Sequence, residues 1–181
     1  MDILAIIKKY YKPETKAYYI LVNHSKAVTK KAVEIAKNLK HLNPDLKFIK
    51  EAAMLHDVGI VMTNFPQIGC FGDKPYLYHG YLGRKILEKE GYPKHALVCE
   101  RHIGVGLTRE DIKELKLKIP KRDMIPISLE EEIICFADKF FSKKDKHLFK
   151  EKNINQIRKE LSEFGKYKAK KFDKLAKKLK Y

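Results

Sequence analysis

The spacing of apolar residues along this chain favours a bundle of helices over any other class of fold. Apolar residues recur every three or four positions in the segment 25–39, at Val28, Ala32, Ile35 and Leu39, and this period places them on one helical face. The same pattern predicts helices in the segments 2–11, 45–58, 79–90, 93–102, 108–115, 128–141 and 153–180. No segment shows the strict alternation typical of a strand. The sequence therefore predicts an all-α fold, with a long loop over residues 60–78.

Length and composition limit the class of protein further. The chain has 181 residues, of which 44% are hydrophobic, enough for one domain with a real core. No apolar run approaches the about 20 residues that a membrane span needs, and the first residues lack the layout of a signal peptide. Three widely spaced cysteines indicate reduced thiols rather than a disulfide framework. We therefore expect a cytoplasmic protein without a membrane partner, of unknown oligomeric state.

The positive charge is concentrated at the C-terminal end. The formal net charge is +16, and residues 139–181 contain 15 Lys and 1 Arg against 5 acidic residues. We predict a helical core over residues 1–142 and a Lys-rich helical extension over residues 143–181 that is not an independent domain. A basic surface favours anionic partners, and weak RNA binding by the extension is one prediction. The alternative is the Lys-rich surface that heat-adapted proteins commonly carry.

Side chains that can bind a metal stand at the ends of the predicted helices. His56 and Asp57 are adjacent, at the end of an apolar helical run and just before Gly59. Imidazole and carboxylate groups are ligands for divalent and ferrous ions, and helical bundles build metal sites from inward-facing side chains on several helices. Asp138 lies within a strongly apolar helix, where an unpaired carboxylate is costly. Three further histidines stand at helix ends or beside glycine: His24, His79 and His102.

Taken in order, these residues form the pattern H…HD…H…H…D. Over about residues 20–142 the chain resembles the HD-domain superfamily of metal-dependent phosphohydrolases, in the HDIG form carried here by His56-Asp57-Val58-Gly59. The context Phe136-Ala137-Asp138-Lys139-Phe140 is similar to the last motif of that family. The resemblance implies a helical HD-domain bundle.

The resemblance also implies a set of ligands. One ion would be held by His24, His56, Asp57 and Asp138. Members with two ions add two histidines, whose places His79 and His102 match, and the aspartate of the HD pair then bridges both ions. Asp57, His79 and His102 are therefore the predicted catalytic residues. One or two divalent ions are expected, with Fe, Mn, Co, Ni and Zn all compatible with such ligands.

The two-metal branch includes cyclic-dinucleotide phosphodiesterases of the HD-GYP type and YqeK-like diadenosine tetraphosphate hydrolases. HD-GYP proteins usually place Gly-Lys after the HD pair, whereas Ile60 stands at the place of that lysine. Gly91-Tyr92-Pro93 lies between His79 and His102, where it reads as a helix break. The resemblance therefore favours the YqeK-like side of the branch over cyclic-dinucleotide hydrolysis.

The predicted reaction is hydrolysis of a nucleotide or another small phosphate ester, in which a hydroxide bridging the ions attacks phosphorus. Basic residues adjacent to the ligands are the candidates for binding the phosphate: Arg84, Arg101 and Lys139. Aromatic residues of the loop either stack on a nucleobase or pack the loop down: Phe65, Phe71, Tyr76 and Tyr78.

Two other functions remain open. Diiron oxygenases of the same fold share the ligand pattern and use a mixed-valent iron pair to activate oxygen, so the ligands alone do not separate the two chemistries. A non-catalytic nucleotide- or RNA-binding module is the other alternative. It predicts salt-dependent RNA affinity that depends on residues 143–181.

Overall fold

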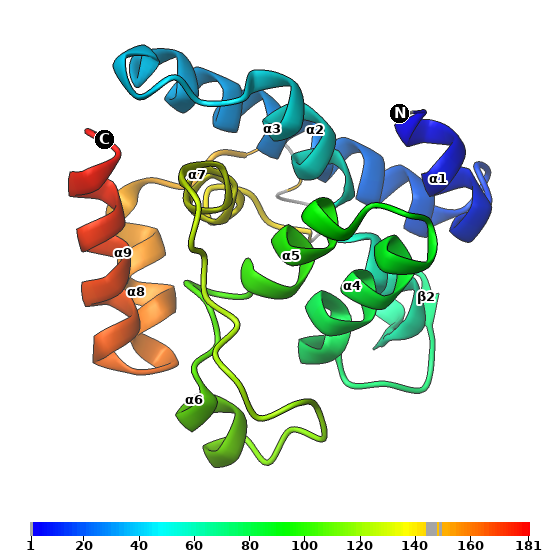
Figure 1. The fold of residues 1–181 in the computed structure, drawn as a ribbon. Coiled ribbons are helices and arrows are strands. Elements are labelled where there is room, and N and C mark those ends of the chain that lie inside the picture. Colours follow the sequence, from blue (N-terminus) through cyan, green and yellow to red (C-terminus); the bar gives the residue numbers. More distant parts are fainter. Residues whose placement is uncertain (1, 144–147, 149) are drawn as a thin grey trace.

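Helices make up almost the whole architecture, which confirms the all-α prediction (Figure 1). The structure is a computed structural model and describes residues 2–143, 148 and 150–181. Its α-helices are α1 (Ile3–Tyr10), α2 (Lys16–Asn38), α3 (Leu46–Leu55), α4 (His79–Lys89), α5 (Pro93–Arg101), α6 (Arg109–Glu114), α7 (Leu129–Asp138), α8 (Ile154–Glu163) and α9 (Lys166–Lys178). Short 3-10 turns are η1 (Lys40–Leu42), η2 (Val58–Met62), η3 (Pro66–Ile68) and η4 (Tyr76–Tyr78), and β1 (Asn64–Phe65) pairs antiparallel with β2 (Cys70–Phe71).

Several helices begin where a side chain caps them. The Asp45 carboxylate accepts from the Phe48 amide at 2.9 Å, and the Ser128 hydroxyl accepts from the Glu131 amide at 3.2 Å. At α6, Thr108 and Asp111 form a complete capping box. At α7 the Glu131 carboxylate accepts from the Ile127 amide, and the reciprocal bond of a capping box is not formed. These caps satisfy amide groups that a helix leaves unpaired at its start.

Helix α2 begins nine residues before the expected segment, and this changes the position of His24. Thr15 caps α2 by accepting from the Tyr18 amide. The apolar stretch 17–22 then continues the helix and buries Ile20 and Leu21. His24 therefore lies inside a 23-residue helix rather than near its start.

Two apolar clusters meet along α2. Its second half, with Val28 and Ala32, belongs to a cluster that also contains residues of α3, α7, α8 and α9. Its first half, with Ile20 and Leu21, belongs to a cluster that contains residues of α1, η2, α4 and α5. His24 stands between these halves, so it lies at the junction of the two clusters. In Figure 1, α7 is seen end-on near the middle of the bundle.

The C-terminal extension shares the first of these clusters. Phe172 on α9 is fully buried and stacks on Phe136 of α7, with ring centroids 4.8 Å apart. Lys168 is also buried and donates to Gly106 O at 2.9 Å and to Asp111. Burial alone would raise the pKa of Asp111, but Lys168 and the Thr108 amide outweigh it and lower that pKa. The boundary after residue 142 stays a prediction, although α8 and α9 add side chains to the common core.

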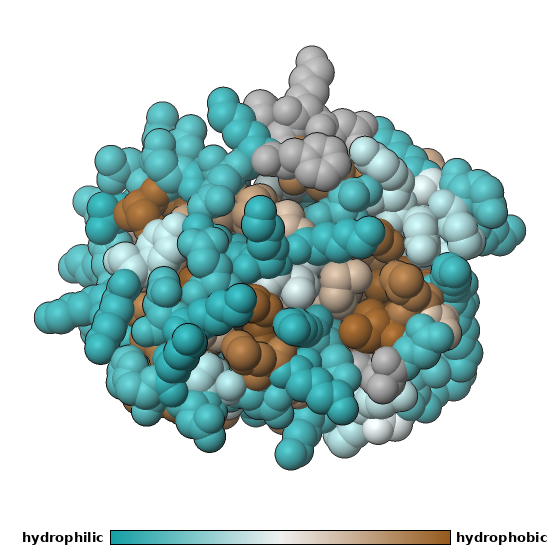
Figure 2. Space-filling view, turned by 90° about the horizontal axis from the view of Figure 1, so that it is seen from above, coloured by the Kyte–Doolittle hydropathy of each residue, from teal (hydrophilic) through white to brown (hydrophobic). Residues whose placement is uncertain are grey.

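The surface is largely hydrophilic. Figure 2 shows one face on which hydrophilic side chains cover most of the area, with apolar residues between them. Within the described ranges, no helix has both the length and the apolar character that crossing a bilayer requires.

We predict that the extension unfolds together with the rest of the bundle. Phe172→Ala should lower the free energy of unfolding by roughly 3–5 kcal/mol, since it removes a buried aromatic ring and leaves a cavity. Phe164→Ala is the matched control, because the Phe164 side chain at the end of α8 is 74% exposed. Urea unfolding followed by circular dichroism measures both variants. A separate early transition of α8 and α9, with an unchanged main transition, would contradict this prediction.

Candidate metal centre

Six buried side chains converge from five parts of the bundle. His24 comes from α2, the pair His56-Asp57 follows α3 directly, and Asp138 is the last residue of α7. His79 is the first residue of α4, and His102 follows the last residue of α5. All six side chains belong to buried residues. The structure thus brings together every residue that the sequence nominated as a metal ligand, although their role as ligands stays a prediction.

The first group of ligand atoms surrounds one oxygen each of Asp57 and Asp138. His24 Nε2 lies 3.2 Å from Asp57 Oδ2 and 3.0 Å from Asp138 Oδ1. His56 Nε2 lies 3.2 Å and 3.3 Å from the same two oxygens. Two imidazole nitrogens and two carboxylate oxygens of this kind form a mixed shell for a divalent ion.

The second group uses the other oxygen of Asp57. His79 Nε2 and His102 Nε2 each lie 3.3 Å from Asp57 Oδ1, and 3.2 Å from each other. The two oxygens of Asp57 therefore face different groups of ligands. This arrangement is the geometry needed for one carboxylate to bridge two ions.

Backbone carbonyl groups fix which nitrogen of three imidazoles faces the centre. The Nδ1 atoms of His56, His79 and His102 lie 2.6, 2.6 and 2.8 Å from the carbonyl oxygens of Ala53, Tyr76 and Cys99, respectively. A carbonyl oxygen only accepts, so each Nδ1 carries a proton and donates it. In the neutral ring the lone pair is then on Nε2, which is the atom that faces the centre.

A cation fits this cluster because it contains too few donors. With Nδ1 protonated, neutral His79 and His102 would point two Nε2 lone pairs at each other and at a carboxylate. Both oxygens of Asp57 are buried, and among the described residues the Lys143 ammonium group, 2.7 Å from Oδ2, is the one clear donor that reaches either of them. Buried acceptors without donors are unfavourable, so a divalent ion in each group would satisfy the cluster. His24 Nδ1 and Ser25 Oγ are likewise without a hydrogen-bond partner among the described residues.

The charges of the cluster perturb its pKa values strongly. Burial alone would raise the pKa of Asp57, but His56 and Lys143 outweigh it and hold that pKa well below the ordinary value. Burial would lower the pKa of His56, yet Asp57 and Asp138 raise it to about 9. Burial dominates at His102 and lowers its pKa to about 4. Perturbed groups of this kind gather at functional sites.

Gly59 allows the two halves of the centre to approach each other. A Cβ atom at this position would lie 2.1 Å from the carbonyl oxygen of His79 and 2.3 Å from the amide of Gly83. Any larger residue would push the start of α4 away from η2, and His79 with it. In the sequence Gly59 follows the end of a predicted helix, a place where glycine commonly stops a helix. It lies instead within η2, and close contact rather than a turn explains the glycine.

The three predicted phosphate-binding residues lie in different surroundings. Arg84 pairs with Glu88 at 2.7 Å and with the buried Glu100 at 2.6 Å. Arg101 pairs with Glu131 at 2.8 Å. The structure places only Lys139 at the centre, with Nζ 2.6 Å from Asp138 Oδ2 and 3.3 Å from His102 O. Binding of substrate by these residues stays a prediction.

Lys143 reaches the centre although sequence reasoning did not select it. Its Nζ lies 2.7 Å from Asp57 Oδ2. Burial would lower the pKa of Lys143, but Asp138 and Asp57 outweigh it and hold that pKa well above its ordinary value. In the sequence this residue is one of many lysines in the basic extension, just beyond the stretch with recognisable motifs. Only the path of the chain after α7 distinguishes it.

The aromatic loop is packed down on one side of the centre. Tyr76 stacks on His79 with ring centroids 4.5 Å apart, and Phe65 contacts Tyr76 at 4.6 Å. The Tyr78 hydroxyl accepts a hydrogen bond from the Lys118 amide at 2.6 Å. Phe71 is 78% exposed. Packing therefore accounts for Phe65 and Tyr76, while stacking on a nucleobase stays a prediction for Phe71.

Comparison with known proteins adds a family and several relatives. A family model for the HD domain matches residues 21–142. Over 121 residues the chain is 36% identical to an uncharacterised protein of Methanocaldococcus jannaschii, an alignment that covers 65% of this chain and 64% of the relative. A tRNA (cytidine(56)-2'-O)-methyltransferase of Thermoplasma volcanium is 31% identical over 140 residues, covering 77% of this chain and 36% of that enzyme.

A protein of the same name from Picrophilus torridus is 29% identical over 124 residues, which cover 68% of this chain and 32% of the relative. The chain thus corresponds to between 32% and 64% of the length of these three relatives. No solved structure matches it.

We predict that the protein binds two divalent ions per chain. His79→Ala should reduce the metal content from two ions to one, because it removes a ligand from the second group only. Asp57→Asn should reduce the affinity for both ions, because both groups use this carboxylate. Metal content is measured by mass spectrometry after the metal-free protein is reloaded and dialysed.

His41→Ala is the matched control, since His41 is exposed and lies outside both groups. One ion in the parent protein, or two in His79→Ala, would remove the second group as a metal site.

Proposed function

This chain belongs to the HD-domain family, and we propose that it is a metal-dependent phosphohydrolase acting on a nucleotide or another small phosphate ester. One observation carries the proposal: the two oxygens of Asp57 face two different groups of ligands, 3.2–3.3 Å from the four histidine Nε2 atoms. Such a centre suits a reaction in which charge is stabilised on a phosphate group.

The ligand residues have distinct tasks in this proposal. His24, His56 and Asp138 would hold the first ion, His79 and His102 would hold the second, and Asp57 would serve both. When bound, two divalent ions polarise a phosphoryl oxygen and lower the pKa of water at the site. The carbonyl oxygens behind three of the imidazoles keep their Nε2 atoms aimed at the centre, so these three ligands are oriented before an ion binds.

Lys139 orients one ligand from the outer side. Its ammonium group binds Asp138 Oδ2 and so leaves Asp138 Oδ1 facing His24 and His56. The Lys139 and Lys143 side chains are 12% and 13% exposed, whereas the His24, His56 and Asp57 side chains are fully buried. The two lysines therefore mark the side of the centre from which an anionic substrate is attracted.

We predict metal-dependent hydrolysis by the purified protein. A panel of nucleoside mono-, di- and triphosphates, cyclic nucleotides and dinucleoside polyphosphates is incubated with Mn²⁺, Co²⁺ or Fe²⁺, and phosphate or nucleotide release is measured. His56→Ala and Asp57→Asn should reduce hydrolysis to background, while Lys139→Met should lower it about 10–100-fold, as expected for an outer partner of a ligand. His41→Ala should match the parent.

Running the same panel without oxygen separates hydrolysis from oxygenase chemistry. The proposal requires equal rates with and without oxygen. Release that depends on oxygen, or equal release by the parent and Asp57→Asn, would refute it.

RNA binding by the basic extension is a second candidate. Two observations favour it: the excess of lysine after residue 139, and the similarity to two proteins named as tRNA methyltransferases. Lysines on exposed positions of α9 would contact the phosphate backbone, and such binding weakens steeply with salt. The lysines concerned include Lys170, Lys174 and Lys177.

Removing the extension is a poor test, because Phe172 is part of the core. We predict instead that Lys170→Glu/Lys174→Glu/Lys177→Glu weakens binding of a transcribed tRNA at least tenfold at low salt, since each phosphate contact contributes to the salt-dependent affinity. Fluorescence anisotropy over a salt series measures it. Metal-dependent hydrolysis of small substrates is the internal control and should be retained. Unchanged affinity of the triple variant would exclude this surface.

A further inference from the structure

A second ammonium group enters the metal centre from beyond the end of α7. Lys143 Nζ lies 2.7 Å from Asp57 Oδ2 and 3.7 Å from Asp138 Oδ1. These are the same two oxygens that His24 Nε2 and His56 Nε2 approach within 3.0–3.3 Å. The charge of Lys143 is therefore directed at the atoms that would bind the first ion.

Lys139 makes a useful contrast. It contacts the opposite oxygen of Asp138, Oδ2, and a backbone carbonyl, that of His102. An ion bound to Asp138 Oδ1 leaves both of these contacts in place. Of the two lysines, only Lys143 shares its carboxylate oxygens with the predicted ion.

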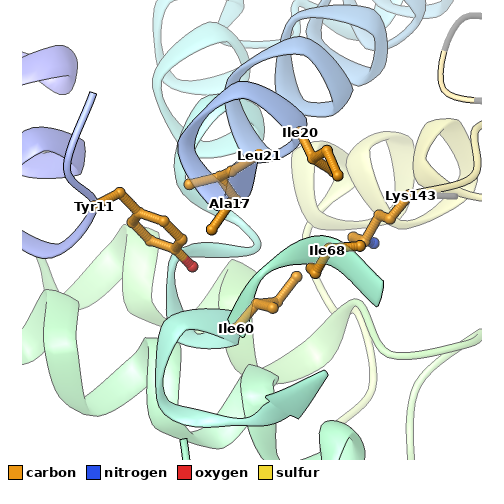
Figure 3. Close-up of a pocket in the computed structure, with 7 residues that line it drawn as sticks. All are labelled: Tyr11, Ala17, Ile20, Leu21, Ile60, Ile68 and Lys143. Atoms are coloured by element: carbon orange, nitrogen blue, oxygen red, sulfur yellow. The ribbon is translucent and has the colours of Figure 1, made fainter. Parts of the chain in front are cut away.

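Apart from the two carboxylates, the Lys143 ammonium group interacts with the Tyr76 hydroxyl, and the walls around the rest of its side chain are mostly apolar. The side chain lines a small pocket with Ile20, Ile60 and Ile68, and Figure 3 shows how it lies among these residues. The polar group of Tyr11, which also lines the pocket, is already used, since its hydroxyl bonds to Val58 O and the Val61 amide. The apolar wall accepts the methylene groups of a lysine, while the charge must find an anion.

A divalent ion bound by the first group would change the electrostatic potential at the Lys143 ammonium group. The ion takes over the negative charge of Asp57 and Asp138, and its own charge repels an ammonium group a few ångströms away. The lysine side chain is flexible and can swing away from the carboxylates. The ammonium group of Lys143 would then be free to pair with an anionic group of a substrate bound at the same centre.

From this geometry we propose that Lys143 is a built-in cation that alternates between two anions. It neutralises Asp57 and Asp138 when the first group holds no ion, and it binds a phosphoryl oxygen of the substrate when an ion is present. Lys143 thus competes with the metal and also recognises the phosphate group of a phosphate ester. This inference rests on the proposed function and adds a substrate-binding residue to it.

The test measures two affinities that should move in opposite directions in Lys143→Met. Isothermal titration of Mn²⁺ into metal-free protein should show tighter binding of the first ion, by about tenfold, because the competing charge is gone. Inorganic phosphate should bind the Mn²⁺-loaded variant about tenfold more weakly than the loaded parent, because a charge-assisted hydrogen bond is lost. The rise in melting temperature on adding Mn²⁺ should be larger in the variant.

Three further variants make the result specific. Lys143→Arg retains the charge and should keep the parent's affinity for Mn²⁺. Lys139→Met should not tighten Mn²⁺ binding, because Lys139 orients Asp138 without sharing its inner oxygen. Lys152→Met removes one positive charge from an ion pair with Glu160 on the extension and should leave both affinities unchanged.

Each outcome decides the inference. Equal or weaker Mn²⁺ binding in Lys143→Met, or unchanged phosphate binding, overturns it. If the parent binds Mn²⁺ and hydrolyses phosphate esters while Lys143→Met behaves like the parent, this inference alone fails. If the parent hydrolyses nothing but both affinities move as stated, the hydrolase proposal fails and the alternating lysine stands. A parent protein that binds no metal refutes both.

Discussion

The bundle depends on how it accommodates the buried carboxylate of Asp57. A charged group without exposure to water is costly unless positive charge surrounds it. Here the ammonium group of Lys143 lies 2.7 Å from one of its oxygens, and four histidine Nε2 atoms that can hold a cation lie 3.2–3.3 Å from the two oxygens. Because these partners come from α2, α4 and the segments that follow α3, α5 and α7, five separate parts of the chain must assemble around one carboxylate.

Positions at helix ends orient three of the imidazole ligands. His56 and His102 follow the last residues of α3 and α5, where the carbonyl groups of Ala53 and Cys99 accept their Nδ1 protons. The Tyr76 carbonyl does the same for His79 at the start of α4. Carbonyl groups near helix ends thereby fix three of the four imidazole rings. The rings of His56, His79 and His102 are held in place because each lies at a helix end beside a carbonyl group that accepts its Nδ1 proton.

Positive charge has separate roles in this protein. Lys168 anchors α9 to Asp111 and Gly106, and Lys139 orients Asp138. Lys143 faces the inner carboxylate oxygens, while the lysines exposed on α9 face solvent. Composition alone presents all of them as a single basic tail. Burial and partner atoms distinguish the structural lysines from those that can meet a ligand.

The sequence by itself determined the helical class, because helical periodicity is a local pattern, and its resemblance to the HD-domain family nominated all six candidate ligands. It did not show that α2 extends back past His24, since the apolar stretch 17–22 looks similar as helix or as loop. Tertiary structure alone decided that Asp57 divides its oxygens between two groups, that Arg84 and Arg101 pair with glutamates, and that Lys143 enters the centre. These relations join residues far apart in the chain, and distance across a folded bundle leaves no periodic signal in a sequence.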